Sequence, residues 1–102
     1  MIPDSNIQVW LDTQAALGQT TLVTYVKSMR DMQIGFRMDV IQRGGAGTSR
    51  ITQKGTINAN AATPTSLGRV ALGIQKGSDC SIELALDESG REIGVYRFDC
   101  AR

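Results

Sequence analysis

The two cysteines carry the only covalent chemistry that the sequence offers. Their spacing, from Cys80 to Cys100, does not match the Cys-x-x-Cys pair of redox proteins. Two thiolates alone are also a poor ligand set for zinc. We therefore favour a structural disulfide between Cys80 and Cys100, which would indicate an oxidising compartment. The alternative is a pair of free thiols, one of them buried.

Carboxylates are the remaining candidates for catalysis, because the sequence contains no histidine. Histidine is the commonest general base and a common metal ligand. Asp12, Asp31, Asp39 and Glu83 all fall on the polar faces of expected strands, where solvated charges are ordinary. We therefore expect no enzyme, no cofactor and no metal site.

Gly44, Gly45 and Gly47 resemble a phosphate-binding loop only in composition. A P-loop continues with Lys and Ser or Thr at the start of a helix. Here residues 48–50 read Thr-Ser-Arg and lead into an expected strand. The tip of a hairpin, where glycine accepts positive φ, is the favoured interpretation.

Alternation of apolar and polar residues, typical of half-buried strands, runs through the chain. It is clearest from Met32 to Val40. No segment has a convincing helical period, and at most one helical turn fits residues 13–18. The expected strands cover residues 7–12, 20–28, 32–40, 48–58, 70–74, 80–87 and 91–99, with turns at 17–19, 44–47, 60–65, 76–79 and 88–90.

The last two strands decide how the cysteines meet. Ile93 lies on the opposite face of its strand from Tyr96 and Phe98. A bulge, or a strand end buried on both faces, would explain this change. With a three-residue turn Cys80 faces Phe98, whereas a longer turn or a bulge places it opposite Cys100. A disulfide closing this loop would stabilise the fold by about 3 kcal/mol.

Seven short antiparallel strands in 102 residues predict an all-β, immunoglobulin-like seven-stranded antiparallel β-sandwich. We expect one domain over residues 1–102, with a core over about 7–100. A small closed barrel is the main alternative.

Charge is balanced overall but uneven along the chain. The net charge of +1 argues against a nucleic-acid-binding protein. Residues 27–54 carry mostly Lys and Arg, and residues 79–99 carry mostly Asp and Glu. If these segments fold into different regions, the surface has a basic and an acidic side that can steer a partner. The alternative is that both are ordinary solvated strand faces.

The start of the sequence has no signal-peptide pattern, because Met1 is soon followed by the polar residues 3–6. A mature exported protein and a cytosolic one would both begin in this way. No run approaches the roughly 18 apolar residues that span a bilayer, so we expect no membrane insertion.

Trp10 has the opposite parity to Val9 and Leu11. We favour a core contact at the edge of the sandwich over a partly exposed anchor. Phe36 belongs to the clearest apolar face and is expected in the core. No strand interleaves aromatic and basic residues on one face, as a nucleic-acid-binding sheet would.

Several segments resemble a known family in order and spacing. They are residues 42–55 (QRGGAGTSRITQKG), 65–72 (TSLGRVAL), 80–84 (CSIEL) and 87–90 (DESG). The chain resembles the CsgC/CsgH family of curli assembly proteins, most of all its alphaproteobacterial CsgH branch. The resemblance covers roughly residues 7–98, and its motifs are hairpin tips and apolar alternations.

The resemblance implies an immunoglobulin-like fold, a periplasmic location and inhibition of premature fibre formation by the curli major subunit. We expect a monomer. The enterobacterial branch carries a Cys-x-Cys pair where this chain reads Met32-Gln33-Ile34. A redox role is therefore not inherited.

The client-binding surface that we expect is basic. Arg37, Arg50 and Lys54 have outward parity, and Arg43 stands at the expected hairpin tip. A charged β-surface favours encounter with a fibre-forming chain and resists joining its fibres. The alternative function is an immunoglobulin-like structural or adhesive module that binds a stable protein or glycan.

Overall fold

The structure is a computed structural model that describes residues 7–16, 18–45, 47–73 and 79–100. These residues form seven strands and contain no helix, so none of them builds a helix able to cross a membrane. The strands are β1 (Ile7–Ala16), β2 (Gln19–Ser28), β3 (Met32–Gly44), β4 (Gly47–Ala59), β5 (Thr65–Leu72), β6 (Asp79–Glu88) and β7 (Arg91–Asp99).

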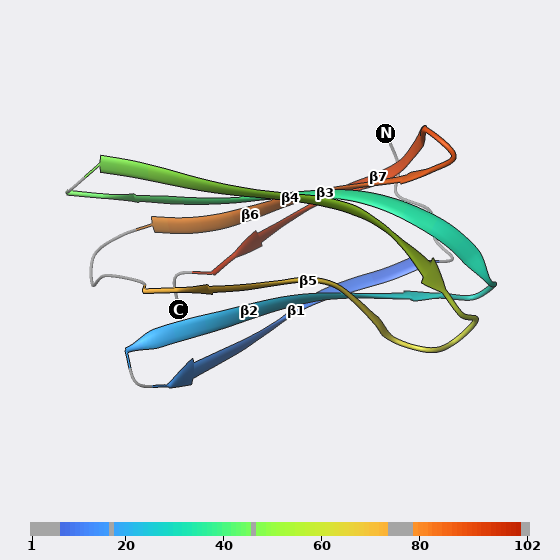
Figure 1. Cartoon of the computed structure of the whole chain (residues 1–102), viewed down its shortest axis with the longest axis horizontal. Coiled ribbons are helices and arrows are strands. Elements are labelled where there is room, and N and C mark those ends of the chain that lie inside the picture. Colours follow the sequence, from blue (N-terminus) through green and yellow to red (C-terminus); the bar gives the residue numbers. More distant parts are fainter. Residues whose placement is uncertain (1–6, 17, 46, 74–78, 101–102) are drawn as a thin grey trace.

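The strands form two antiparallel sheets, which Figure 1 shows as two stacked layers. The smaller sheet has the order β1-β2-β5, and the larger has the order β4-β3-β6-β7. The chain changes sheet between β2 and β3, between β4 and β5, and between β5 and β6, as in immunoglobulin-like sandwiches. The predicted fold class is confirmed. The closed-barrel alternative is wrong, because no strand pair within the described residues joins the two sheets.

The core lies between the two sheets, because alternate side chains of each strand point inward. Val26, Ile34 and Leu84 are fully buried there. Thr24 is also fully buried, and its hydroxyl donates to the Sδ of Met38 at 3.5 Å. That contact satisfies the hydroxyl away from water.

Strands β1, β3 and β5 extend by at least four residues beyond their predicted bounds. β5 begins at Thr65 rather than at Val70, because Leu67 is an extra residue in its pairing with β2. This bulge breaks the alternation that would have revealed the strand. β1 continues to Ala16, so the helical turn allowed at residues 13–18 is wrong for 13–16. The predicted strand end at Ile74 and the turn at residues 76–78 lie outside the described residues.

A second bulge lies in β7. Leu86 pairs with Gly94 and Asp87 pairs with Glu92, which leaves Ile93 as the extra residue. Ile93 is 6% exposed and belongs to the core. The bulge explains the change of apolar parity in this strand. It is the first of the two explanations that the sequence predicted.

The bulge also brings the cysteines opposite each other. Beyond it the register places Ser81 across from Asp99, so that Cys80 and Cys100 follow as the next pair. Their Cα atoms are 5.0 Å apart and their sulfurs are bonded. The N–H of Cys100 donates to the carbonyl oxygen of Cys80 at 3.0 Å. The predicted disulfide is confirmed, and the free-thiol alternative is wrong.

Trp10 lies on the outer face of the smaller sheet. Its ring stacks on Tyr25, its partner across the strands, with centroids 5.7 Å apart and planes 17° apart. Val9 and Leu11 have the opposite parity and pack against the core. The favoured interpretation of Trp10 as a core contact is therefore wrong, and the partly exposed alternative holds.

Candidate interaction surface

Four basic side chains gather on the outer face of the larger sheet, on β3 and β4. Arg37 stands directly opposite Lys54 in the register, and Arg50 stands opposite Ile41. Arg43 has the same parity and pairs with Thr48, so it lies inside β3 rather than at the hairpin tip. All four residues are exposed. We call Arg37, Arg43, Arg50 and Lys54 the basic strip.

Asp39 lies within the basic strip and organises part of it. Thr52 Oγ1 donates to Asp39 Oδ1 at 2.6 Å, and Arg37 Nε donates to Asp39 Oδ2 at 3.3 Å. The Thr52 hydrogen bond and the positive charges of Arg37 and Arg50 hold the pKa of Asp39 below its ordinary value, against an opposing effect of burial. Asp39 is therefore an anion at neutral pH, and it orients Arg37 along the sheet.

An acidic border runs along β6 beside the basic strip. Asp79 faces Arg43, and Glu83 faces Asp39. Like charges directly opposite each other destabilise a sheet. Here Arg97 Nη2 donates to Glu83 Oε2 at 2.8 Å, which gives that carboxylate its own cation. The basic strip and the acidic residues of β6 are thus neighbours on one face of the larger sheet, not opposite sides of the molecule.

A shallow hollow of about 380 Å³ lies where the basic strip meets the acidic border. Arg37 and Lys54 line it together with Asp87 and Glu92. Ala85, the β6 partner of Arg37, is the small residue among them. The hollow was not predicted from the sequence. The signal was a small outward residue, Ala85, between two charged residues on the same face of the strand, Glu83 and Asp87.

A protein-family model described as CsgH protein matches residues 8–96. The chain belongs to the CsgH family. The solution structure of CsgH from R. palustris shares 26% identity with this chain, covers 91% of each chain and has a TM-score of 0.75. The E. coli curli protein CsgC shares 16% identity over 90% of this chain and 97% of that chain, and its TM-score of 0.76 shows the same fold. No curated protein sequence matches.

The resemblance to the CsgC/CsgH family that the sequence segments indicate is therefore confirmed. In this CsgH-family chain the candidate catalytic carboxylates are spread over the fold. Asp31 accepts a hydrogen bond from the N–H of Ala61 at 2.6 Å, and Asp12 lies on β1. Asp39 and Glu83 are neighbours but are each held by an arginine on an open sheet face.

The described residues of this CsgH-family chain contain no group of three or more His, Cys, Asp or Glu side chains placed to hold a metal ion. Both cysteines are in the disulfide. What the described surface does offer is a group of exposed charges on a paired sheet, which suits contact with another macromolecule.

Proposed function

We propose that this CsgH-family protein is a periplasmic inhibitor of amyloid formation by the curli major subunit. It acts without catalysis, as a monomer, through weak and transient electrostatic contact with the aggregating client. Membership of the CsgH family and the fold shared with the E. coli curli protein CsgC support a curli-related role. The observation that carries the finer proposal is the exposed basic strip on β3 and β4.

The basic strip favours encounter with acidic segments of the client. Its side chains extend into solvent, and the Arg37 side chain is 54% exposed. Exposed ion pairs contribute about 0–1 kcal/mol each, so such contacts form and break readily. Their range is about 8 Å at physiological ionic strength. Inhibition should therefore weaken as salt is added.

The same strip protects the protein from joining the fibre. Arg50 and Lys54 lie on β4, an edge strand of the larger sheet. Charged side chains on an edge strand discourage pairing with another β-strand. The inhibitor can thus meet an amyloid-forming chain on this face without extending it. The disulfide between Cys80 and Cys100 is compatible with the periplasm.

The proposal is tested by a thioflavin fibrillation time course of the curli major subunit, with this protein added at a small fraction of the client concentration. We expect a strongly lengthened lag. We expect the lag to return to that of the client alone when Arg37, Arg43, Arg50 and Lys54 are all replaced by Glu. An unchanged lag with folded wild-type protein would contradict inhibition. A complex of fixed stoichiometry, without any effect on the lag, would favour the adhesive-module alternative.

A matched control separates the basic strip from net charge. Lys27 and Arg69 lie on the outer face of the smaller sheet, where their partners are Gln8 and Val23. The double variant Lys27→Glu/Arg69→Glu changes the net charge as much as Arg37→Glu/Lys54→Glu does. We expect a shorter lag with Arg37→Glu/Lys54→Glu than with the wild type, and the same lag as the wild type with Lys27→Glu/Arg69→Glu. Equal effects would show that net charge, and not the strip, matters.

A further inference from the structure

In the part of the chain that the structure describes, the sandwich has four edge strands, β1 and β5 in the smaller sheet and β4 and β7 in the larger. A free edge presents unpaired backbone N–H and C=O groups, and native proteins usually protect it. The edge of β5 is covered by side chains from the other sheet. Gln53 Nε2 donates to the carbonyl oxygen of Arg69, and Gln42 Nε2 donates to that of Gly73, both at 3.1 Å.

β4 and β7 carry protection of other kinds. β4 presents Arg50 and Lys54 along its length. β7 is interrupted by the bulge at Ile93, and Arg97 and Asp99 add charge beyond it. Bulges and charged side chains both disfavour the addition of another strand. Three of the four edges are therefore guarded.

Within the described residues, β1 has neither a bulge nor a side chain from the other sheet hydrogen-bonded to its edge, and it carries little charge. Its ten residues, IQVWLDTQAA, include one charged residue, Asp12, and no Lys or Pro. It pairs with β2 in one uninterrupted register from Ile7 to Ala16, without a bulge. A long, regular and nearly uncharged edge strand is the kind that accepts a further strand.

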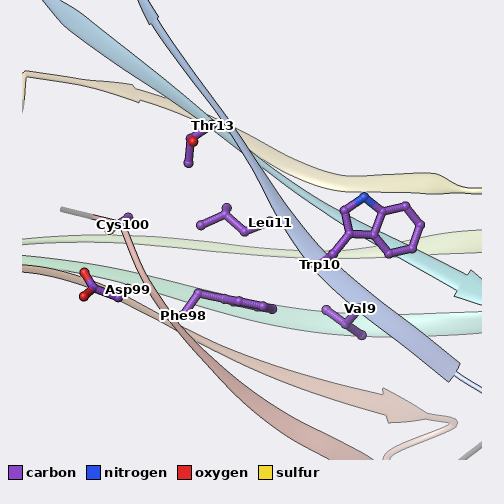
Figure 2. Close-up of a pocket in the computed structure, with 7 residues that line it drawn as sticks. All are labelled: Val9, Trp10, Leu11, Thr13, Phe98, Asp99 and Cys100. Atoms are coloured by element: carbon purple, nitrogen blue, oxygen red, sulfur yellow. The ribbon is translucent and has the colours of Figure 1, made fainter. Parts of the chain in front are cut away.

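An apolar groove of about 370 Å³ runs beside β1, between it and β7. Figure 2 shows Leu11 and Thr13 extending from β1 on the side of Phe98 and Cys100, whereas Trp10 extends to the other side. Leu11 and Phe98 are only partly buried, although both pack against the core. A strand added to β1 would place every second side chain over this groove.

We propose that β1 is a strand-addition edge, which pairs with an extended segment of the amyloid-forming client. This inference rests on the proposed function and adds to it a second contact surface, on the opposite sheet from the basic strip. The backbone groups of β1 require an extended partner, and the groove takes the apolar side chains of one face of that partner. Amyloid-forming chains contain such segments, with high β-propensity and low charge.

Charge and packing both select this occupant. Asp12 and Asp99 lie at β1 and at the groove, so the paired segment is neutral or basic rather than acidic. A second copy of this chain is a poorer occupant through its own β1. In that copy Val9 and Leu11 already pack against a core and cannot also fill the groove. An unfolded client has its apolar side chains available.

Pairing with β1 would halt growth on one side of the client segment. The other edge of β1 is already paired with β2 along its whole length. A client strand paired with β1 therefore has no position on that side where another client strand could add. This contact would complement the basic strip, which attracts the client but does not fix its conformation.

Hydrogen exchange tests the inference without relying on inhibition. The probe is a synthetic peptide of ten residues, the length of β1, with alternating valine and glutamine and a lysine at each end. We expect the peptide to slow exchange of alternate β1 amides and to leave β4 amides unchanged. Thr13→Lys, which extends a long charged side chain into the groove, should weaken peptide binding roughly tenfold, because the added strand would have to displace that side chain and desolvate its ammonium group.

Ala71→Lys is the matched control. Ala71 is exposed on β5, a covered edge, and the substitution adds the same charge. We expect wild-type peptide binding from this variant. In the fibrillation assay, Thr13→Lys should lose part of the lag extension and Ala71→Lys should keep it.

The outcomes separate this inference from the proposed function. One outcome would overturn the strand-addition edge and keep the inhibitor. In it the wild type lengthens the lag, the peptide does not slow exchange in β1, and the Thr13→Lys variant lengthens the lag as much as the wild type. If the wild type does not lengthen the lag but the peptide protects β1, the edge stands and the curli client is wrong. Protection of β1 that grows with protein concentration alone, with a dimer in sedimentation, would assign the edge to a second copy and overturn the inference.

Discussion

The two seams of the sandwich, where the edges of its sheets approach each other, are built differently. At the seam between β4 and β5, Gln53 and Gln42 reach from the larger sheet to backbone carbonyl oxygens at the edge of the smaller one. At the seam between β1 and β7 lies an apolar groove. Polar side chains close the first seam, whereas no described residue covers the edge of β1 at the second. The side of the core at β4 and β5 is thus closed by hydrogen bonds, and the side at β1 and β7 is accessible.

The largest expected effect comes from removing the disulfide at the end of the accessible seam. Cys100 lines the groove and ties the end of β7 to β6. The double variant Cys80→Ala/Cys100→Ala should lower the free energy of unfolding by about 3 kcal/mol, measured by urea denaturation. Exchange at the end of β7 should accelerate more than exchange at Gln53. A loss below about 1 kcal/mol would show that strand pairing alone holds this end.

A smaller effect is expected from opening the closed seam. A Cβ atom at Gly68 would lie 2.5 Å from Gln53 Oε1 and 3.1 Å from Met38 Cε. Both atoms end flexible side chains that can move aside, so Gly68→Ala should displace the Gln53 amide and lower the free energy of unfolding by about 0.5–1.5 kcal/mol, the contribution of the lost hydrogen bond. Thermal or urea denaturation measures it, and faster exchange of β5 amides would locate the change.

The control for that variant is Gly45→Ala, at a glycine whose added Cβ would meet no atom within 4 Å. We expect a change within about 0.5 kcal/mol. If both alanine variants have the same stability, the glutamine contacts do not hold the closed seam, and the contrast between the seams would rest on the groove alone.

The smallest expected effect concerns Asp39. This residue lies on β3, next to the strand β4 of the closed seam. Its folded-state pKa lies below the ordinary value of 3.8, chiefly because of the Thr52 hydrogen bond. A lowered pKa adds stability that is complete above the ordinary carboxyl pKa and is lost as pH falls through the lowered value. Thr52→Ala should raise the pKa of Asp39, as measured by carbon-13 NMR titration, and should reduce this loss at acid pH. An unchanged pKa would assign the shift to Arg37 and Arg50.

Much of the fold could be predicted from local sequence because the strands alternate. The faces of β3 and β4 follow directly from parity, which is why Arg37, Arg50 and Lys54 could be placed on one surface before the structure was known. The disulfide could be predicted because only one pairing of cysteines exists. The bulge in β7 left a visible trace in the parity of Ile93.

Features that depend on pairing between distant strands could not be predicted. The acidic border beside the basic strip arises because β3 pairs with β6 across the intervening chain. Neither segment carries a local signal for that partner. The start of β5 was missed because the bulge at Leu67 interrupts its alternation. The groove beside β1 depends on two strands in different sheets, and no single stretch of sequence contains it.

The bulge at Ile93 makes the disulfide a check on the register of the last hairpin. Glu88 and Arg91 pair at the turn, and without an extra residue this register would set Cys80 across from Asp99. The thiols of Cys80 and Cys100 would then project from opposite faces of the sheet, where an oxidant could not join them. Oxidation therefore seals only the hairpin that has already taken its bulged form. A chain whose last hairpin pairs without the bulge keeps two free thiols. Its reduced cysteines would distinguish it from the correctly folded protein under oxidising conditions.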